Sequence, residues 1–359
     1  MVRLERGRTR SPWSVKIGDP RTVFAPLDGL PASSETHFRG VGPGALAIAS
    51  LVLALAACLT THSPTTSRTR TTVVPSETAA IPSAGREGAS VPAQTKELPR
   101  GGRLLFPAHR LVGYCGTPGA PALGALQGNL DAKAKALEAR AAPYADGREI
   151  LPVFELIAVV VQGYGGADGK YRSRVDDRVV DDYLRAARQS KALLLLNIQP
   201  GQSDFLTEVK SFEAYLREPD VGVALDPEWA MKAKQRPGVS WGETTGAAIN
   251  DVAAFLSGIV KQWNLPEKAL VFHEVVREVV KGESLVTPYP GVAIIKSVDG
   301  IGPAQAKIAT YGNLMEKMAA GVHPGFKLFF DEDTHGGSRL MTPKEVLSLS
   351  PQPEYVMYE

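Results

Sequence analysis

Short apolar runs alternate with amphipathic stretches from about residue 103 to the end of the 359-residue chain. Short apolar runs predict buried strands, and longer stretches with apolar positions three or four apart predict helices. The expected strands cover residues 110–115, 151–159, 192–198, 221–225, 269–273, 291–298, 326–330 and 355–358. Helices are expected at 123–141, 176–190, 205–216, 246–263 and 304–320, with shorter ones at 275–282 and 342–349. Asp204 and Thr342 are the expected N-caps of two of them.

This alternation predicts parallel strands joined by right-handed helical crossovers. Eight expected strands favour a closed (β/α)8 barrel of the TIM type over a doubly wound sheet, and no Gly-x-Gly-x-x-Gly turn follows the first strand. The sequence ends directly after the eighth expected strand, so we expect an α/β barrel that lacks its last helix. We also expect the residues before Arg110 to cover the gap that this leaves in the outer ring.

The first 102 residues are rich in Ser, Thr, Pro, Ala and Arg and show no sustained period. Residues 45–57 form an apolar run that is short for a membrane span, which takes about 20 residues, but suits a signal-peptide core. The run leads into Ala56-Ala57-Cys58, which resembles the bacterial lipobox. The resemblance implies acylation of Cys58, for instance with palmitate, and an extracytoplasmic protein held at the cell membrane. An ordinary signal peptide or an uncleaved anchor is the alternative.

We therefore expect three parts: an N-terminal extension with a lipoprotein signal peptide over 1–57, a disordered tether over 58–102, and the barrel domain over 103–359. The first 102 residues carry 12 Lys and Arg against 7 Asp and Glu, whereas the remainder carries 28 against 31. Because the barrel domain has no basic excess, we expect no nucleic-acid partner. Cys115 is the second of two cysteines, so no disulfide is expected once Cys58 is acylated. The chain is expected to be a monomer.

The expected strand 221–225 ends in two acidic residues, Asp226 and Glu228. Residues two apart in an extended chain point to the same face, and on that face the acids follow the small residues Gly222 and Ala224. The bulky residues of the strand point to the other face. This pattern predicts a barrel strand with room on its inner side, next to acids at the C-terminal mouth where barrel enzymes place their active sites.

Most other expected strands also end in polar or acidic residues, although each one alone is compatible with a solvated strand end. The period of the strand 326–330 places Asp331 and Asp333 toward the barrel axis and Glu332 away from it. The residues expected to bind substrate around the mouth are Tyr114, Gln199, Trp229, His273, Asp299, Asp331 and Asp333.

Glu155 is unusual because it lies inside an apolar run. It is either a catalytic carboxyl group whose pKa burial raises, or one half of an ion pair with Lys296 or Lys327 inside the barrel. Both interpretations stay open at this point.

The sequence Asp226-Pro227-Glu228-Trp229 resembles the end of the fourth barrel strand in chitinase-type glycosidases and phage-type muramidases. The resemblance implies that Glu228 protonates the leaving glycosidic oxygen, that Asp226 orients an N-acetyl group acting as the nucleophile, and that Trp229 packs on a sugar ring. The match covers only a few residues, and Ala224 stands where the chitinase pattern has a further Asp. A two-carboxylate mechanism with Glu155, Asp299 or Asp333 as the second acid therefore stays open.

The expected function is that of a membrane-anchored, glycoside hydrolase-like protein acting on a cell-envelope glycan without a metal or cofactor. One alternative is a non-catalytic lipoprotein that binds an envelope glycan or lipid. Another is a metal-dependent hydrolase. Of six histidines, His273 alone ends an expected strand, so a multi-histidine zinc site is not expected. An oxygen-ligated Ca²⁺ or Mg²⁺ site involving Asp226, Asp299 and residues 331–335 stays open.

Overall fold

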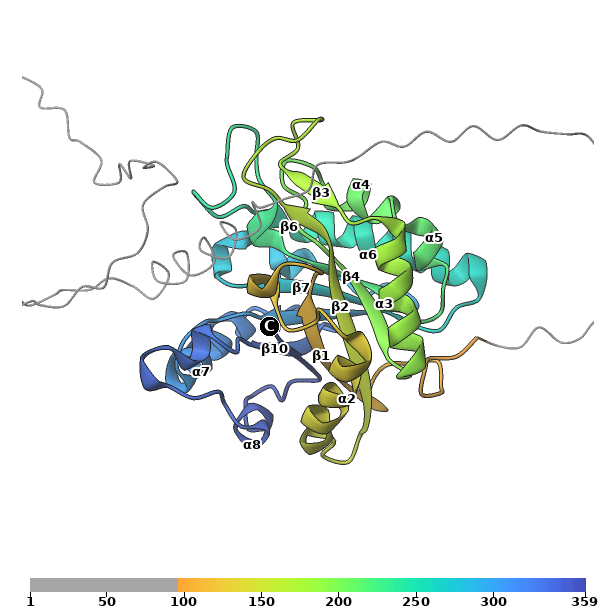
Figure 1. Ribbon diagram of the computed structural model, residues 1–359, viewed down its shortest axis with the longest axis vertical. Helices are drawn as coiled ribbons and strands as arrows, with labels where there is room; N and C mark the ends of the chain where they lie inside the picture. The colour runs from red at the N-terminus through yellow and green to blue at the C-terminus, as the bar shows by residue number, and fades with distance from the viewer. Residues whose placement is uncertain (1–95) are drawn as a thin grey trace, which may run out of the picture. The chain divides into compact units, whose positions relative to one another are not determined.

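The computed structural model describes residues 96–359. Eight parallel strands follow one another around a closed barrel (Figure 1). Strand β1 pairs with β2 on one side and with β11 on the other, and this double pairing closes the sheet. The barrel strands are β1 (His109–Gly116), β2 (Glu149–Val161), β4 (Leu193–Ile198), β5 (Val221–Leu225), β7 (Lys268–Glu274), β9 (Val292–Val298), β10 (His323–Leu328) and β11 (Tyr355–Tyr358).

Helices lie between most of these strands on the outside of the barrel (Figure 1). The expected helix 275–282 is not formed, since the 3₁₀ turn η5 (Arg277–Val279) and the short strand β8 (Val280–Lys281) take its place between β7 and β9. Asp204 and Thr342 cap α4 and α8 as expected, since their side chains accept hydrogen bonds from the backbone nitrogens of Thr207 and Glu345. No helix follows β11 in the described part of the chain. The helices are α2 (Leu130–Ala141), α3 (Asp177–Gln189), α4 (Phe205–Lys210), α5 (Glu213–Leu216), α6 (Gly246–Trp263), α7 (Ala304–Met315) and α8 (Pro343–Leu347).

Several element boundaries differ from the expected ones. The predicted helix 123–141 begins only at Leu130, because Gly124 and Gly128 adopt positive φ angles and Asn129 caps the helix. The predicted strand 326–330 instead runs from His323 to Leu328. Its first half contains Pro324 and Gly325, which are weak strand formers, so the hydrophobic pattern alone detects it late.

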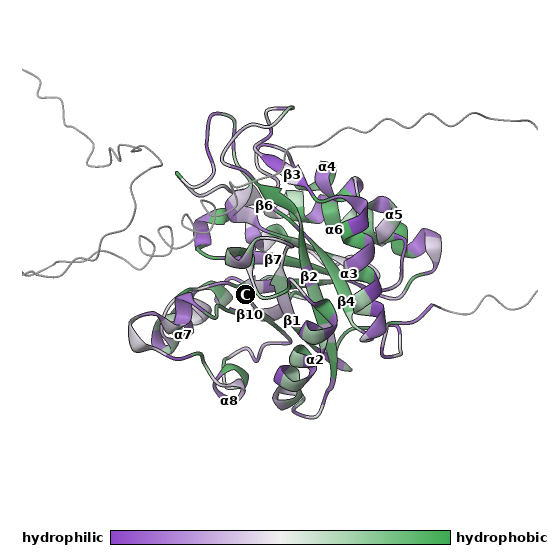
Figure 2. Ribbon diagram, in the orientation of Figure 1, coloured by the Kyte–Doolittle hydropathy of each residue, from purple (hydrophilic) through white to green (hydrophobic). Residues whose placement is uncertain are grey.

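Two hydrophobic cores lie on opposite sides of the barrel wall. Along β5, Val221, Val223 and Leu225 belong to the outer core between the strands and helices, and Ala224 belongs to the inner one. The predicted orientation of this strand is therefore confirmed. Figure 2 shows β2 and β4 as predominantly hydrophobic strands, whereas α3 carries hydrophilic residues. A strand covered on both faces needs this composition.

The segment before β1 closes the N-terminal end of the barrel. Leu98, Leu105 and Phe106 are buried in the inner core. Arg103 donates a hydrogen bond of 2.7 Å to the backbone oxygen of Leu265, and the Glu267 side chain accepts one of 2.8 Å from the backbone nitrogen of Leu105. The described fold thus includes residues 96–102, which the sequence pattern assigns to the tether.

The expectation that this segment covers the place of the missing helix is wrong. In the sector between α8 and the end of α2, where a helix after β11 would pack, an open groove of about 650 Å³ remains. It is lined by Pro143, Asp146, Thr342, Pro343, Lys344, Leu347, Ser348 and Gln352. The inner core at the barrel end offers the segment's apolar side chains a drier environment than this partly polar groove does.

Within residues 96–359 no helix is both long and apolar enough to cross a membrane. The expected signal peptide, the acylation site Cys58 and residues 58–95 of the expected tether lie outside the described residues. Cys115 lies in β1 and is buried in the inner core.

Candidate active site

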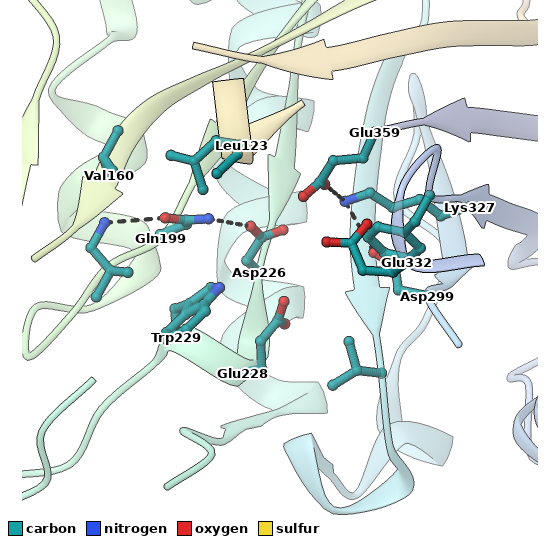
Figure 3. A pocket seen from close by; sticks show the side chains of 14 residues that line it. Leu123, Val160, Gln199, Asp226, Glu228, Trp229, Asp299, Lys327, Glu332 and Glu359 are labelled. Carbon is teal, nitrogen blue, oxygen red and sulfur yellow. Dashed lines mark hydrogen bonds and ion pairs between the residues drawn. The ribbon is translucent and has the colours of Figure 1, made fainter. Parts of the chain in front are cut away.

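A narrow pocket opens at the C-terminal end of the barrel strands (Figure 3). Its cavity of about 30 Å³ has room for about two water-sized groups. The wall combines carboxylates with apolar side chains such as Leu123, Trp229 and Phe329. The full lining consists of Ala122, Leu123, Val160, Val161, Gln199, Asp226, Glu228, Trp229, Val275, Asp299, Lys327, Phe329, Glu332 and Glu359.

Asp226 follows the last residue of β5 and is held by two amides. The side-chain nitrogens of Asn197 and Gln199 donate hydrogen bonds of 3.0 and 3.1 Å to its two carboxyl oxygens. Gln199 is fixed in turn, because its side-chain oxygen accepts a hydrogen bond of 3.1 Å from the backbone nitrogen of Val161. Burial raises the pKa of Asp226, while His273, Lys327 and the donated hydrogen bonds counteract that increase.

Glu228 lies on the one-turn 3₁₀ helix η4 (Pro227–Trp229), which Pro227 starts at its first position. Its side chain is only 5% exposed and points into the pocket (Figure 3). The buried oxygen Oε2 has no hydrogen-bond partner among the described residues. Burial raises the pKa of Glu228 well above its usual value, and the nearby charges of Asp226 and Asp299 raise it further. Within the Asp226–Glu228 pair, the stronger upward shift of the pKa of Glu228 favours the proton on Glu228.

Charged side chains form a continuous network of ion pairs beneath and beside the pocket. The His273 ring lies between two carboxylates, with Nδ1 2.9 Å from Asp299 Oδ2 and Nε2 3.2 Å from Glu155 Oε1. The contact with Glu155 is an ion pair whose alignment does not make a hydrogen bond. Lys327 Nζ lies 3.2 Å from Asp299 and 2.5 Å from Glu359. These contacts connect side chains of β2, β7 and β10 with Asp299 and Glu359, which directly follow β9 and β11.

The charged network lowers the pKa values of two of its acids, Glu155 and Asp299. Burial would raise the pKa of Glu155, but His273, Lys327 and the Tyr355 hydroxyl lower it to about 2. The pKa of Asp299 is likewise lowered, because His273 and Lys327 outweigh the effect of burial. Burial would lower the pKa of His273, yet Asp299 and Glu155 raise it well above its usual value. The network thus contains two acids with lowered pKa values close to Glu228, whose pKa is raised.

Five of the predicted site residues line the pocket together: Gln199, Asp226, Glu228, Trp229 and Asp299. Glu155 and His273 lie beneath it, fully buried, and do not line it. Glu155 accepts hydrogen bonds from Tyr355 and Asn197. Of the two lysines considered as partners of Glu155, Lys327 belongs to the charged network, where it pairs with Asp299 and Glu359. Lys296 instead forms ion pairs with Glu274 and Glu283, each at 2.6 Å.

Three predicted binding residues lie elsewhere. Tyr114 is buried in the outer core, where its hydroxyl accepts a hydrogen bond of 3.1 Å from Arg140, because its neighbours in β1 take the inward positions. Asp331 is exposed and does not line the pocket. Asp333 is buried in an ion pair of 3.0 Å with Lys307 and accepts hydrogen bonds from the backbone nitrogens of Phe329 and Gly302.

Sequence reasoning missed Glu332, which lines the pocket. The expected strand period fails here because β10 ends at Leu328 and the 3₁₀ helix η7 (Glu332–Gly337) begins four residues later. The same period places Lys327 on the inner face of the strand, so a search for inward-facing charges finds that residue. Glu359 follows β11 directly and lines the pocket as well.

Among residues 96–359, no group of three or more His, Cys, Asp and Glu side chains is arranged to hold a metal ion. The carboxylates around the pocket therefore share one space without converging on one point.

The loop after β2, which contains the short strand β3 (Arg172–Arg174), carries Tyr164 with 56% of its surface exposed.

Neither a family model nor a curated protein matches this chain.

Proposed function

We propose that this protein is a glycoside hydrolase-like enzyme that acts on a cell-envelope glycan, with Glu228 as the general acid. The observation that carries the proposal is the state of Glu228: a buried carboxyl group with a raised pKa, facing a pocket with one oxygen unpartnered among the described residues. A general acid must be protonated at the working pH and able to reach the leaving oxygen.

Asp226 is the proposed second carboxylate. Glycosidases use one protonated and one ionised carboxyl group on opposite sides of the scissile bond. Asp226 and Glu228 line the same pocket, and the amides of Asn197 and Gln199 stabilise the charged form of Asp226. Each Asp226 oxygen keeps a free lone pair, so Asp226 retains the capacity to activate water or to attack the sugar.

Glu155 is proposed as a positioning residue rather than the second acid. It lies beneath the pocket and accepts a hydrogen bond of 2.9 Å from the same Asn197 nitrogen that donates to Asp226. Its low pKa keeps it an acceptor, and this fixes the orientation of Asn197.

The decisive experiment compares wild type with Glu228→Gln on a panel of cell-envelope glycans, with released reducing ends as the readout. The substitution keeps the shape but removes the transferable proton, so turnover should fall by about 10²–10⁴-fold. Glu278→Gln is the control, because Glu278 is exposed and does not line the pocket. Undiminished turnover by a folded Glu228→Gln protein would rule out Glu228 as the acid.

The pH profile provides an independent check. Activity should fall as the pH rises through the raised pKa of Glu228, and on the acid side as Asp226 becomes protonated.

The small cavity also suits the alternative, a protein that binds an envelope glycan without cleaving it, since two water-sized spaces do not hold a whole sugar ring. The glycan would then lie across the mouth. Binding of a panel glycan by wild type without any release of reducing ends would favour this alternative.

We further propose that the protein is held outside the cell membrane by a lipid on Cys58, on the basis of the lipobox-like sequence Ala56-Ala57-Cys58. Cys58→Ala should move the protein from the membrane fraction to the soluble extracytoplasmic fraction. Unchanged retention in the membrane fraction would contradict the anchor.

A further inference from the structure

The pocket carries an excess of acidic groups over basic ones. Of the described residues that line it, five are acids and a single one, Lys327, is basic. Lys327 is already engaged by Asp299 and Glu359. The five acids are Asp226, Glu228, Asp299, Glu332 and Glu359.

Three of these acids, Asp226, Glu228 and Glu332, form no ion pair with any described residue. In Figure 3 their carboxyl groups lie around the same space in front of Lys327. His273 is the nearest further cation, but it lies beneath the pocket between Glu155 and Asp299. Because the raised pKa of Glu228 favours its neutral form, the unpaired charge comes from Asp226 and Glu332, and it gives this space a negative potential that the protein itself does not neutralise.

Glu228 gives a second and independent indication of a ligand. Its side chain is 95% buried, since 5% is exposed, and Oε2 has no partner among the described residues although it faces the pocket. A buried polar oxygen without a hydrogen bond costs free energy, and a polar ligand group at this position removes that cost.

The size of the cavity limits which group can enter. A volume of about 30 Å³ admits an ammonium group, which is about as large as a water molecule, but not an acetamido group with its four heavy atoms. A divalent cation is disfavoured, because no three of the described acids are arranged around a common point.

From charge, unmet hydrogen bonding and size together, we infer that the glycan carries a free, protonated amino group that enters the pocket beside Glu332. This inference rests on the proposed function and specifies its substrate class as a glycan of de-N-acetylated amino sugars. Leu123, Trp229 and Phe329 supply apolar surface for the carbon face of the sugar ring. A free amine cannot act as the nucleophile that an N-acetyl group provides, so the ionised carboxylate has to come from the protein, and Asp226 is in place for it.

Binding to the Glu228→Gln protein tests the inference without requiring cleavage. Titration calorimetry would compare tetramers of glucosamine and of galactosamine with their N-acetylated counterparts. At least one free-amine tetramer should bind about tenfold more tightly than its N-acetylated form, because a charge-assisted hydrogen bond replaces a steric conflict. An increase in salt from about 50 mM to about 500 mM should weaken this binding severalfold.

A second variant separates the amine contact from general damage to the site. Adding Glu332→Gln should weaken free-amine binding about tenfold and leave any binding of N-acetylated tetramers unchanged, whereas adding Glu278→Gln should alter neither. Equal or tighter binding of the N-acetylated forms, or no binding of either free amine, would overturn the inference. Cleavage of an N-acetylated glycan by wild type would overturn it while leaving the proposed function intact. Amine binding without cleavage would do the reverse.

Discussion

Glu155 is a carboxylate that the interior of the barrel keeps charged. It has no exposed surface, yet His273, Lys327 and the Tyr355 hydroxyl lower its pKa to about 2. A pKa that is lower in the folded chain than in the unfolded one stabilises the fold at pH values above the unfolded pKa of 4.5. This contribution is lost as the pH falls toward the folded pKa.

Glu155→Gln should therefore destabilise the protein by about 3 kcal/mol near pH 7, because the shift from 4.5 to about 2 corresponds to that free energy. The difference from wild type should shrink between about pH 4.5 and pH 2, where wild type also loses the charge. Urea unfolding measured across this range checks the prediction. A difference that stays constant with pH would show that the effect comes from packing rather than from the charge.

Several residues of the site could be identified from the sequence, but the side chains that they contact could not. Asp226 and Glu228 stand out in the sequence because two acids end an apolar run whose inner side is small. The contact between His273 and Glu155 joins residues 118 positions apart, and no local pattern encodes it. Glu155 was expected to have either a raised pKa or a lysine partner. Its main partner is a histidine, because β7 brings position 273 next to it.

At the scale of single elements, the small inward-facing residues of β5 allow the neighbouring barrel strands to pack closely. An added Cβ at Gly222 would lie 2.7 Å from the backbone oxygen of Ala269 and 2.7 Å from a methyl carbon of Leu195. The first of these neighbours is backbone and cannot turn aside. The small residue in the predicted inward position is therefore a packing requirement of the fourth barrel strand.

Gly222→Ala should destabilise the fold by about 1–3 kcal/mol, the usual cost of overpacking a core. Gly258 in α6 is the matched control, because nothing lies within 4 Å of its added Cβ and it is exposed. Gly258→Ala should stabilise the protein by about 0.5–1 kcal/mol through helix propensity. Thermal and urea unfolding of both variants measure the contrast. A Gly222→Ala protein as stable as wild type would mean that β5 moves to make room.

The alternation of strands and helices predicted the closed barrel, because the strands are covered on both faces and carry a predominantly apolar signal. Loops carry no such period, and for this reason the positions of Asp331, Glu332 and Asp333 after β10 could not be predicted from strand parity. Strand ends could therefore be located from the sequence, but the side chains beyond them could not be oriented.

For the molecule as a whole, the segment before β1 packs on a different surface of the barrel from the expected one, and residues 96–102 were expected to belong to the tether. Apolar residues such as Leu105 and Phe106 tend to be buried, but hydrophobicity does not show which surface buries them. The structure places them at the N-terminal end of the barrel and leaves the sector between α8 and α2 as an open groove. The pocket thus lies at one end of the barrel interior, and this segment covers the other end.

Leu105→Ala should accordingly destabilise the whole barrel by about 2–5 kcal/mol, because it removes a fully buried side chain from the inner core. Leu104→Ala is the adjacent control: Leu104 is 60% exposed, and its truncation should change the free energy of unfolding by less than about 0.5 kcal/mol. Both values come from urea denaturation followed by far-UV circular dichroism, with unfolding expected in a single transition. If the two variants were equally stable, the segment would be a surface attachment rather than part of the core. A separate early transition in Leu105→Ala would instead show that the barrel end opens independently of the rest.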